Sequence, residues 1–166
     1  MKKLFVVLLL VFLLCFTFSC QKGEEVAEEP VVDVEADVEA IKDMLENQYV
    51  SIIAKGDFER WLAFCTEDVI FMPPNSVVLK GKDAIREFVQ PYFEQFNLET
   101  DVTVDEIEVS GDWAFARWHY SAQYIPKAGG DAIPENGKEI WIFKRQADGT
   151  WKCSHAIWNS DMPPQT

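Results

Sequence analysis

The chain has 166 residues, and its 28 acidic and 15 basic side chains give a formal net charge of −13. Nucleic-acid binding depends on Lys and Arg side chains that neutralise phosphates, and adhesion to anionic lipid needs the same charges. The composition therefore argues against both partners. The length fits one domain of ordinary size behind a short leader.

The N-terminus has the order of a secretory signal. Two lysines precede an apolar run over residues 4–18, interrupted only by Thr17. The run is about 15 residues long, whereas a membrane-spanning helix needs roughly 20. Lipoprotein processing cleaves just before a cysteine and attaches lipid to its thiol. We therefore expect residues 1–19 to be a lipoprotein signal peptide and Cys20 to carry a lipid that holds the protein to a bacterial membrane, in the periplasm or at the cell surface. An ordinary cleaved signal or an uncleaved anchor is the alternative.

A strongly acidic segment follows the predicted cleavage site. Residues 21–39 contain eight acidic side chains, one lysine and one proline. Such a segment repels itself and can bury almost no apolar surface. We expect residues 20–36 to form a disordered tether and residues 37–166 to form a single folded domain.

Cysteine usage leaves two alternatives open. Cys65 and Cys153 remain in the predicted domain. An oxidising compartment would permit a disulfide between them, and two buried free thiols are equally compatible with the sequence. No spacing of Cys and His residues indicates a metal site, and nothing in the sequence indicates a cofactor.

The periodicity of apolar residues predicts three helices in the first half of the domain. The first is a long amphipathic helix that includes residues 41–52 and ends at Gly56. A second, shorter helix begins after Asp57, which is a suitable N-cap. The third begins near Asp83, and Pro91 should kink or divide it.

The second half of the domain shows the alternation that is typical of strands. A short strand is expected at residues 69–72, and four more at 102–109, 113–124, 139–145 and 151–159. Three helices followed by hairpin-linked strands indicate an α+β fold with helices on one face of an antiparallel sheet. A curved sheet of this kind leaves a pocket between its concave face and the helices.

Six short motifs occur in order along the predicted domain: YVSIIAKGD at 49–57, EDV at 67–69, GKDAI at 81–85, GDWAFAR at 111–117, DGTWK at 148–152 and IWNSD at 157–161. Together they resemble the nuclear transport factor 2-like superfamily, which includes ketosteroid isomerases, and in particular its SnoaL-like group. The resemblance covers residues 37–161 and implies a cone-shaped, curved antiparallel sheet packed on three N-terminal helices. The superfamily includes isomerases, cyclases, dehydratases and non-enzymatic binders, so the fold leaves the function open.

This chain differs from ketosteroid isomerases at the positions of their two catalytic acids. Their oxyanion-hole tyrosine falls on Tyr49, but their general base falls on Pro73 and their second oxyanion donor on Trp141. Proton abstraction beside a carbonyl needs a base and donors for the enolate oxygen. Many SnoaL-like sequences also place an acid where this chain has Ala156. We therefore do not expect steroid isomerase chemistry.

The same resemblance implies which strand residues face the pocket. They are Phe115, Arg117 and His119 on one strand, Gly137, Glu139 and Trp141 on the next, and Ser154, Ala156 and Trp158 on the last. With Tyr49 they predict a pocket with aromatic walls in which Glu139 holds Arg117 until an anionic ligand group replaces it. The alternatives are that Arg117 and Glu139 form a purely structural ion pair and that His119 and the tryptophans serve packing or the surface.

Three functions remain compatible with the sequence. The favoured one is binding of a small apolar or amphipathic molecule whose anionic end meets Arg117. The second is a SnoaL-type enzyme with isomerase, cyclase or hydratase chemistry, for which His119 and Glu139 are the candidate catalytic residues. The third is a non-catalytic accessory or dimerisation domain that would form a homodimer.

Overall fold

The computed structural model describes residues 33–163, so the predicted signal peptide, Cys20 and residues 20–32 of the predicted tether lie outside the described residues. Within the described part, helix α2 (Val34–Asp43) begins inside the segment assigned to the tether. The reason is a side-chain cap, because Asp33 accepts a hydrogen bond of 3.1 Å from the backbone N–H of Ala36. The predicted long helix is thus extended by several residues at its start.

The first helix contains a π-helical segment. Helix α2 leads without a break into the π-helix η1 (Met44–Tyr49) and then into α3 (Val50–Lys55). Gly56 ends the helix with a left-handed φ of 65°, as predicted. Segments of π-helix are frequent at functional sites, and this one ends at Tyr49.

Within residues 33–163, two further helices follow, α4 (Phe58–Leu62) and α5 (Gly81–Gln95). Asp57 caps α4 as predicted, by accepting a hydrogen bond of 3.1 Å from the N–H of Arg60. Helix α5 runs through Pro91 to Gln95, so Pro91 does not divide the helix, and the alternative of a kink at this proline stays a prediction. Tertiary packing explains the difference, since α5 buries Ile85 on one side of the proline and Phe93 on the other.

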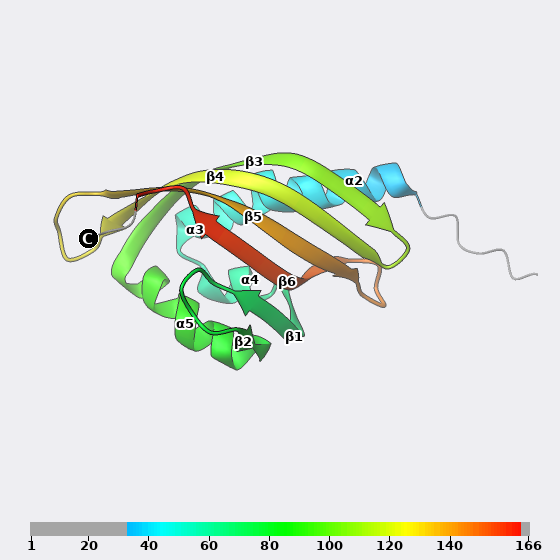
Figure 1. Ribbon diagram of the computed structural model, residues 1–166, viewed down its shortest axis with the longest axis horizontal. Helices are drawn as coiled ribbons and strands as arrows, with labels where there is room; N and C mark the ends of the chain where they lie inside the picture. The colour runs from blue at the N-terminus through cyan, green and yellow to red at the C-terminus, as the bar shows by residue number, and fades with distance from the viewer. Residues whose placement is uncertain (1–32, 164–166) are drawn as a thin grey trace, which may run out of the picture. The chain divides into compact units, whose positions relative to one another are not determined.

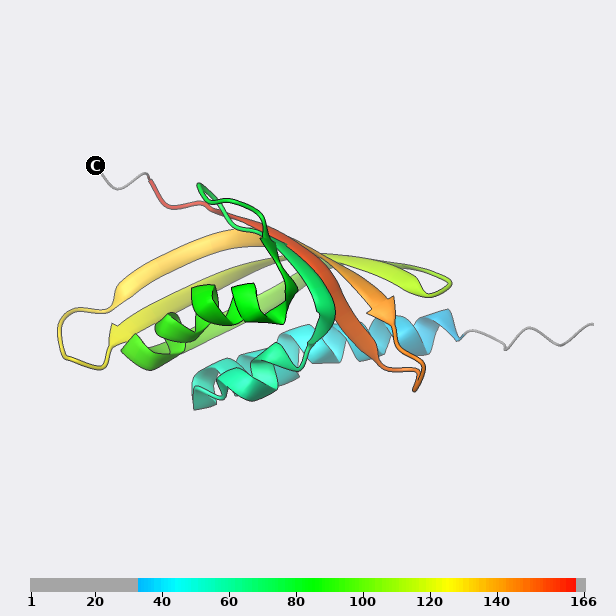
Figure 2. The same ribbon diagram turned by 90° about the horizontal axis from the view of Figure 1, so that it is seen from below.

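Six strands form one curved sheet, with the order β2-β1-β6-β5-β4-β3. Their bounds are β1 (Cys65–Met72), β2 (Leu79–Lys80), β3 (Phe96–Ser110), β4 (Trp113–Pro126), β5 (Ile133–Arg145) and β6 (Trp151–Ser160). The pairs are antiparallel except that β1 lies parallel to β6, so the sheet is mixed (Figure 1). Figure 2 shows the sheet arching over the helices, which lie on its concave side. This is the expected cone-shaped α+β fold.

The core lies between the first helix and the concave face of the sheet. Ile41 and Leu45 of the helix and Trp118 and Phe143 of the sheet are almost completely buried. Among residues 33–163, no helix has both the length and the apolar character that crossing a membrane requires.

The two cysteines of the domain meet on neighbouring strands. Cys65 of β1 and Cys153 of β6 are register partners in the parallel pair, and both are buried. They are free thiols, so of the two alternatives left by the sequence, the structure has the unbridged one.

Candidate ligand-binding site

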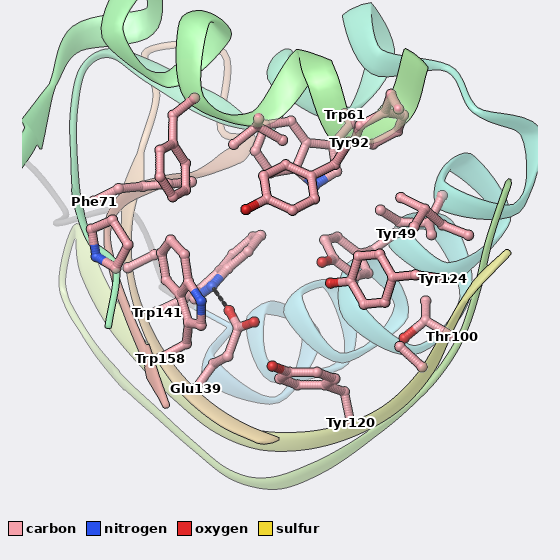
Figure 3. A pocket seen from close by; sticks show the side chains of 18 of the residues that line it. Tyr49, Trp61, Phe71, Tyr92, Thr100, Tyr120, Tyr124, Glu139, Trp141 and Trp158 are labelled. Carbon is pink, nitrogen blue, oxygen red and sulfur yellow. Dashed lines mark hydrogen bonds between the residues drawn. The ribbon is translucent and has the colours of Figure 1, made fainter. Parts of the chain in front are cut away.

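A cavity of about 260 Å³ lies between the concave face of the sheet and the helices (Figure 3). That is room for about nine water molecules at roughly 30 Å³ each, and slightly less than the roughly 300 Å³ at which ligand pockets usually begin. Twenty residues line it, and half of them are aromatic: Tyr49, Trp61, Phe71, Phe88, Tyr92, Phe93, Tyr120, Tyr124, Trp141 and Trp158. The space suits a molecule of one or two rings.

Five of the residues expected in the pocket do line the cavity. Tyr49 reaches it from the end of η1, Glu139 and Trp141 from β5, and Ala156 and Trp158 from β6. Pro73 lines it too. Their position is thus established, whereas their part in ligand binding remains a prediction.

The expected face of β4 is wrong. In the β4–β5 ladder, Trp118 is the partner of Glu139, and Arg117 is the partner of Ile140. Directly paired residues share a face, and shifting a strand by one residue moves every side chain to the other face. Phe115, Arg117 and His119 therefore lie on the convex face, opposite the cavity.

Arg117 and His119 make their polar contacts on that convex face. Asp105 has no partner in the β3–β4 register and forms a bulge there. Arg117 bonds to Asp105 at 3.0 Å and to Glu106 at 3.1 Å, while His119 Nδ1 lies 3.0 Å from Asp105. The side chains of Arg117 and His119 are 48% and 55% exposed. The predicted ion pair between Arg117 and Glu139 does not form.

A bulge also moves one predicted residue of β6. The β5–β6 register shifts between Ile142 and Phe143, and Ser154 falls at the shift. Its hydroxyl donates to the Ile142 carbonyl at 3.0 Å, so it is buried in the sheet and is not among the residues that line the cavity.

The inward face of β4 consists of the residues that the sequence interpretation passed over. Tyr120, Ala122 and Tyr124 line the cavity, and Ala116 and Trp118 continue this face into the core. The even positions from 114 to 124 are aromatic or alanine, and the odd positions from 117 to 123 are polar. Binary alternation, taken literally, indicates the observed face.

Tyr120 lies against the sheet because residue 137 has no side chain. A Cβ atom at Gly137 would lie 2.5 Å from the Tyr120 hydroxyl oxygen and 2.5 Å from the Asn159 carbonyl oxygen. Contacts under 3.0 Å force one of the partners to move. Gly137 was predicted to face the pocket, and its contribution is the space that the Tyr120 ring occupies.

Glu139 is the acidic centre of the cavity. Part of its side chain is open to the cavity, but the carboxyl group lies deep in the domain. The Trp141 indole N–H donates to Glu139 Oε2 at 2.5 Å. Burial raises the pKa of Glu139 to about 8, and the Trp141 hydrogen bond opposes this shift. In the empty cavity at pH 7 this carboxyl is therefore largely protonated.

Three tyrosine hydroxyls converge on the space beside Glu139. Figure 3 shows the hydroxyls of Tyr49, Tyr120 and Tyr124 directed into the cavity. Burial, with the nearby acids, raises the pKa of Tyr124 to about 12 and also raises the pKa values of Tyr49 and Tyr120. These hydroxyls are thus protonated at neutral pH and can donate or accept. Within residues 33–163 no side chain meets these hydroxyls with regular hydrogen-bond geometry, although the Trp61 indole N–H near Tyr49 lowers the pKa of Tyr49 against the effect of burial.

A fourth polar group in the wall has no partner. The Trp61 indole N–H is buried near Tyr49 but meets no acceptor with hydrogen-bond geometry. An unmet buried donor costs about 1–3 kcal/mol. A ligand acceptor atom near Trp61 would recover part of this cost.

Comparisons with known proteins agree with the fold. The sequence profile of the SnoaL-like domain matches residues 47–152. A ketosteroid isomerase-like protein from Erwinia carotovora atroseptica is 24% identical over 82% of this chain and 99% of its own, with a TM-score of 0.64. A nuclear transport factor 2-like superfamily protein from Salmonella enterica is 16% identical over 79% and 92%, with a TM-score of 0.60.

One further solved structure contains a ligand. It is a protein from Catenulispora acidiphila in complex with S-DNPA, 16% identical over 76% of this chain and 95% of its own, with a TM-score of 0.60. At these identities the similarity concerns the fold alone. No curated protein sequence matches the chain.

Proposed function

The chain belongs to the SnoaL-like domain family, and we propose that its cavity binds a small, mainly apolar molecule carrying one polar group that meets Glu139. The observation that carries this proposal is a single carboxyl group enclosed by aromatic walls and flanked by tyrosine hydroxyls. Apolar walls with a few polar groups that fix orientation are the usual composition of a small-molecule site.

The position of Arg117 changes the expected chemistry of the ligand. An anionic end was expected because Arg117 was assigned to the pocket, but Arg117 lies on the convex face in ion pairs with Asp105 and Glu106. Of the described residues that line the cavity, none is Lys, Arg or His. The proposed ligand is therefore neutral or cationic at its polar end. His119 lies on the same convex face, so a catalytic role for it on a bound molecule is not proposed.

We also propose that lipid on Cys20 holds this domain at a bacterial membrane, outside the cytoplasm. The support is the signal-like order of residues 1–19 and the acidic segment that follows. Cys20→Ser should move the protein from the membrane fraction to the soluble fraction, because each buried CH₂ of an acyl chain contributes about 0.8 kcal/mol. A Cys20→Ser protein that stays membrane-bound with residues 1–19 attached would contradict the lipid anchor.

Ligand binding is tested by filling the cavity. Native mass spectrometry of the protein extracted from its own membrane should show a bound small molecule. Ala122→Trp should abolish that mass, because residue 122 lines the cavity, whereas Ser121→Trp, next to it on the opposite exposed face, should retain it. Loss in both variants, or in neither, would count against the cavity as the binding site.

A second candidate function is supported by the convex face. Ile140 and Ile157 are exposed cross-strand partners at its centre, and Arg117 is the β4 partner of Ile140. Contiguous exposed apolar side chains on a sheet often mark an interface. This supports a homodimer through the convex face. Analytical ultracentrifugation should then detect a dimer that Ile140→Asp dissociates, and a monomer at all concentrations would contradict it.

A further inference from the structure

We propose that the polar group of the ligand is a positively charged amine, and that the cavity is an aromatic cage in which Glu139 is the counter-ion of an organic ammonium. This inference rests on the proposed function, since it requires that the cavity binds a ligand at all. It names the chemical class of that ligand.

Among the described residues that line the cavity, the side chains are acidic or neutral. The two ionisable carboxyl groups in it are Glu139, deep inside, and Glu99, which is exposed at the rim. Among the described lining residues no cation faces either of them. An ionised carboxylate is costly to bury unless a positive charge accompanies it, and here only a ligand could supply that charge. An anionic ligand would add a second uncompensated charge, so the wall selects against it.

The aromatic rings around Glu139 have a geometry that favours a cation. Trp141 holds one carboxyl oxygen through its N–H, and Figure 3 shows the other oxygen directed into the open cavity. Tyr49 packs edge-on against Trp141 with ring centroids 5.6 Å apart, and Tyr120 and Trp158 lie on either side of Glu139 in Figure 3. Faces of Trp and Tyr attract a cation within about 6 Å of the ring centroid. The aromatic rings and the free oxygen of Glu139 thus line the same cavity.

The proton on Glu139 links binding of a cation to pH. The groups that face it are Tyr49 from η1, Tyr120 and Tyr124 from β4, Trp141 on its own strand and the Cys153 thiol of β6, and all of these are neutral at pH 7. Burial raises the pKa of Glu139 to about 8, so the empty cavity holds the carboxylic acid. When an ammonium ion enters, the Glu139 O–H bond breaks and its proton passes to the solvent. Binding of the cation therefore releases a proton and strengthens as the pH rises towards 8.

The test compares two probes with the same number of non-hydrogen atoms. Phenethylamine is an ammonium ion at neutral pH, and 2-phenylethanol has a neutral hydroxyl in place of the amine. In calorimetric titrations at pH 8, phenethylamine should bind at least about tenfold more tightly than 2-phenylethanol, a difference of 1.4 kcal/mol. Repeating the titration at pH 7 in phosphate and in Tris should show proton release with the amine and none with the alcohol.

Glu139→Gln should remove the preference and the proton release together while 2-phenylethanol still binds. Glu108→Gln, which removes one exposed acid from β3 outside the cavity, should change neither. Circular dichroism checks the fold of each variant, and the buffer comparison on the unmodified protein tests the inference even if Glu139→Gln does not fold. If the alcohol binds equally or more tightly, the proposal of a cationic ligand is wrong, while the proposed function still holds. If neither probe binds, the proposal of a cationic ligand is also wrong. A native mass spectrum without a bound molecule would then contradict the proposed function as well.

Discussion

Two shielded carboxyl groups of this domain have opposite electrostatics. Asp37 of α2 accepts hydrogen bonds of 2.7 and 2.5 Å from Arg145 and one of 3.0 Å from the Trp151 indole N–H. These contacts lower the pKa of Asp37, the Arg145 hydrogen bond having the largest effect. Glu139 also accepts from a tryptophan N–H, but no arginine faces it, and burial raises its pKa to about 8.

The difference shows that the fold supplies a cation to the Asp37 carboxylate and supplies none to the Glu139 carboxyl group. The Asp37–Arg145–Trp151 cluster fastens the first helix to β5 and β6, and Arg145 also stacks over the Trp151 ring with its guanidinium carbon 4.2 Å from the centroid. Both carboxylate oxygens of Asp37 accept hydrogen bonds. Glu139 accepts one hydrogen bond, from Trp141, and its other oxygen faces the open cavity. A carboxyl group with a shifted pKa in a cavity is a frequent feature of functional sites.

The largest expected effect is the pH dependence that Glu139 gives to stability. Folding raises its pKa from the ordinary value of 4.5 to about 8, so its stabilising contribution is complete below about pH 4.5 and is lost as the pH rises towards 8. Relative to Glu139→Gln, the unmodified protein should lose up to about 1.4 kcal/mol of unfolding free energy per pH unit in this window. Urea denaturation at pH 5 and pH 8 measures the difference. A constant gap would mean that Glu139 ionises normally.

Breaking the Asp37 cluster should cost about 1–3 kcal/mol, the range for a hydrogen-bonded group left without its partner, because the pair is only partly buried. Asp37→Asn keeps the shape and removes the charge, so Arg145 is left without its main counter-ion. Because the pKa of Asp37 is lowered, its contribution is present above the unfolded pKa and is lost as the pH falls through the folded value. Thermal unfolding of the variant and the unmodified protein should therefore converge in acid.

Asp112→Asn is the matched control for that prediction. Asp112 also contacts Arg145, at 3.5 Å, but its side chain is 76% exposed. Surface ion pairs contribute about 0–1 kcal/mol. Equal destabilisation by both substitutions would show that the cluster owes nothing to its burial.

Gly137→Ala should destabilise by about 1–3 kcal/mol, the usual cost of overpacking. The new methyl group would displace the Tyr120 ring. The double variant Gly137→Ala/Tyr120→Leu should recover part of the loss in unfolding free energy, because the ring contact is then gone. No recovery would place the whole clash on the Asn159 carbonyl.

The smallest expected effect separates the two tryptophan donors. Trp141→Phe removes the one hydrogen bond that favours ionised Glu139, so the pKa of Glu139 should rise further and binding of phenethylamine at pH 7 should weaken severalfold. Trp151→Phe removes one of three bonds to Asp37, and Arg145 should still keep the pKa of Asp37 low. Side-chain carboxyl NMR of both variants reports the two titrations. An unchanged Glu139 titration in Trp141→Phe would show that the hydrogen bond has no influence on it.

Local features of the fold were predictable because they depend on neighbouring residues. Gly56 ended the first helix and Asp57 capped the second, since a left-handed C-cap and an acceptor for orphan N–H groups are properties of a few adjacent residues. The parallel pairing of β1 with β6 depends on segments far apart in the chain, and the sequence interpretation did not include it.

The candidate site was predictable in part. Glu139, Trp141 and Trp158 were placed on the inward face by resemblance to a known family, but the same resemblance put β4 one residue out of register. Phe115, Arg117 and His119 were assigned to the pocket on that resemblance alone. The alternation of aromatic and alanine residues against polar ones on β4 indicated the opposite face. Burial of the Glu139 carboxyl without a cation follows from tertiary structure and has no local signal.

The π-helical segment allows the first helix to serve two sites at once. A π turn accommodates one extra residue, which in a regular α-helix would rotate the part of the helix before it by about 100°, the angle that each residue covers. With the extra residue accommodated in this way, Asp37 faces Arg145 while Tyr49 faces the cavity. A homologue one residue shorter between Asp37 and Tyr49 should therefore have a regular α-helix there and keep both contacts, whereas one further inserted residue without a second π turn should break one of them.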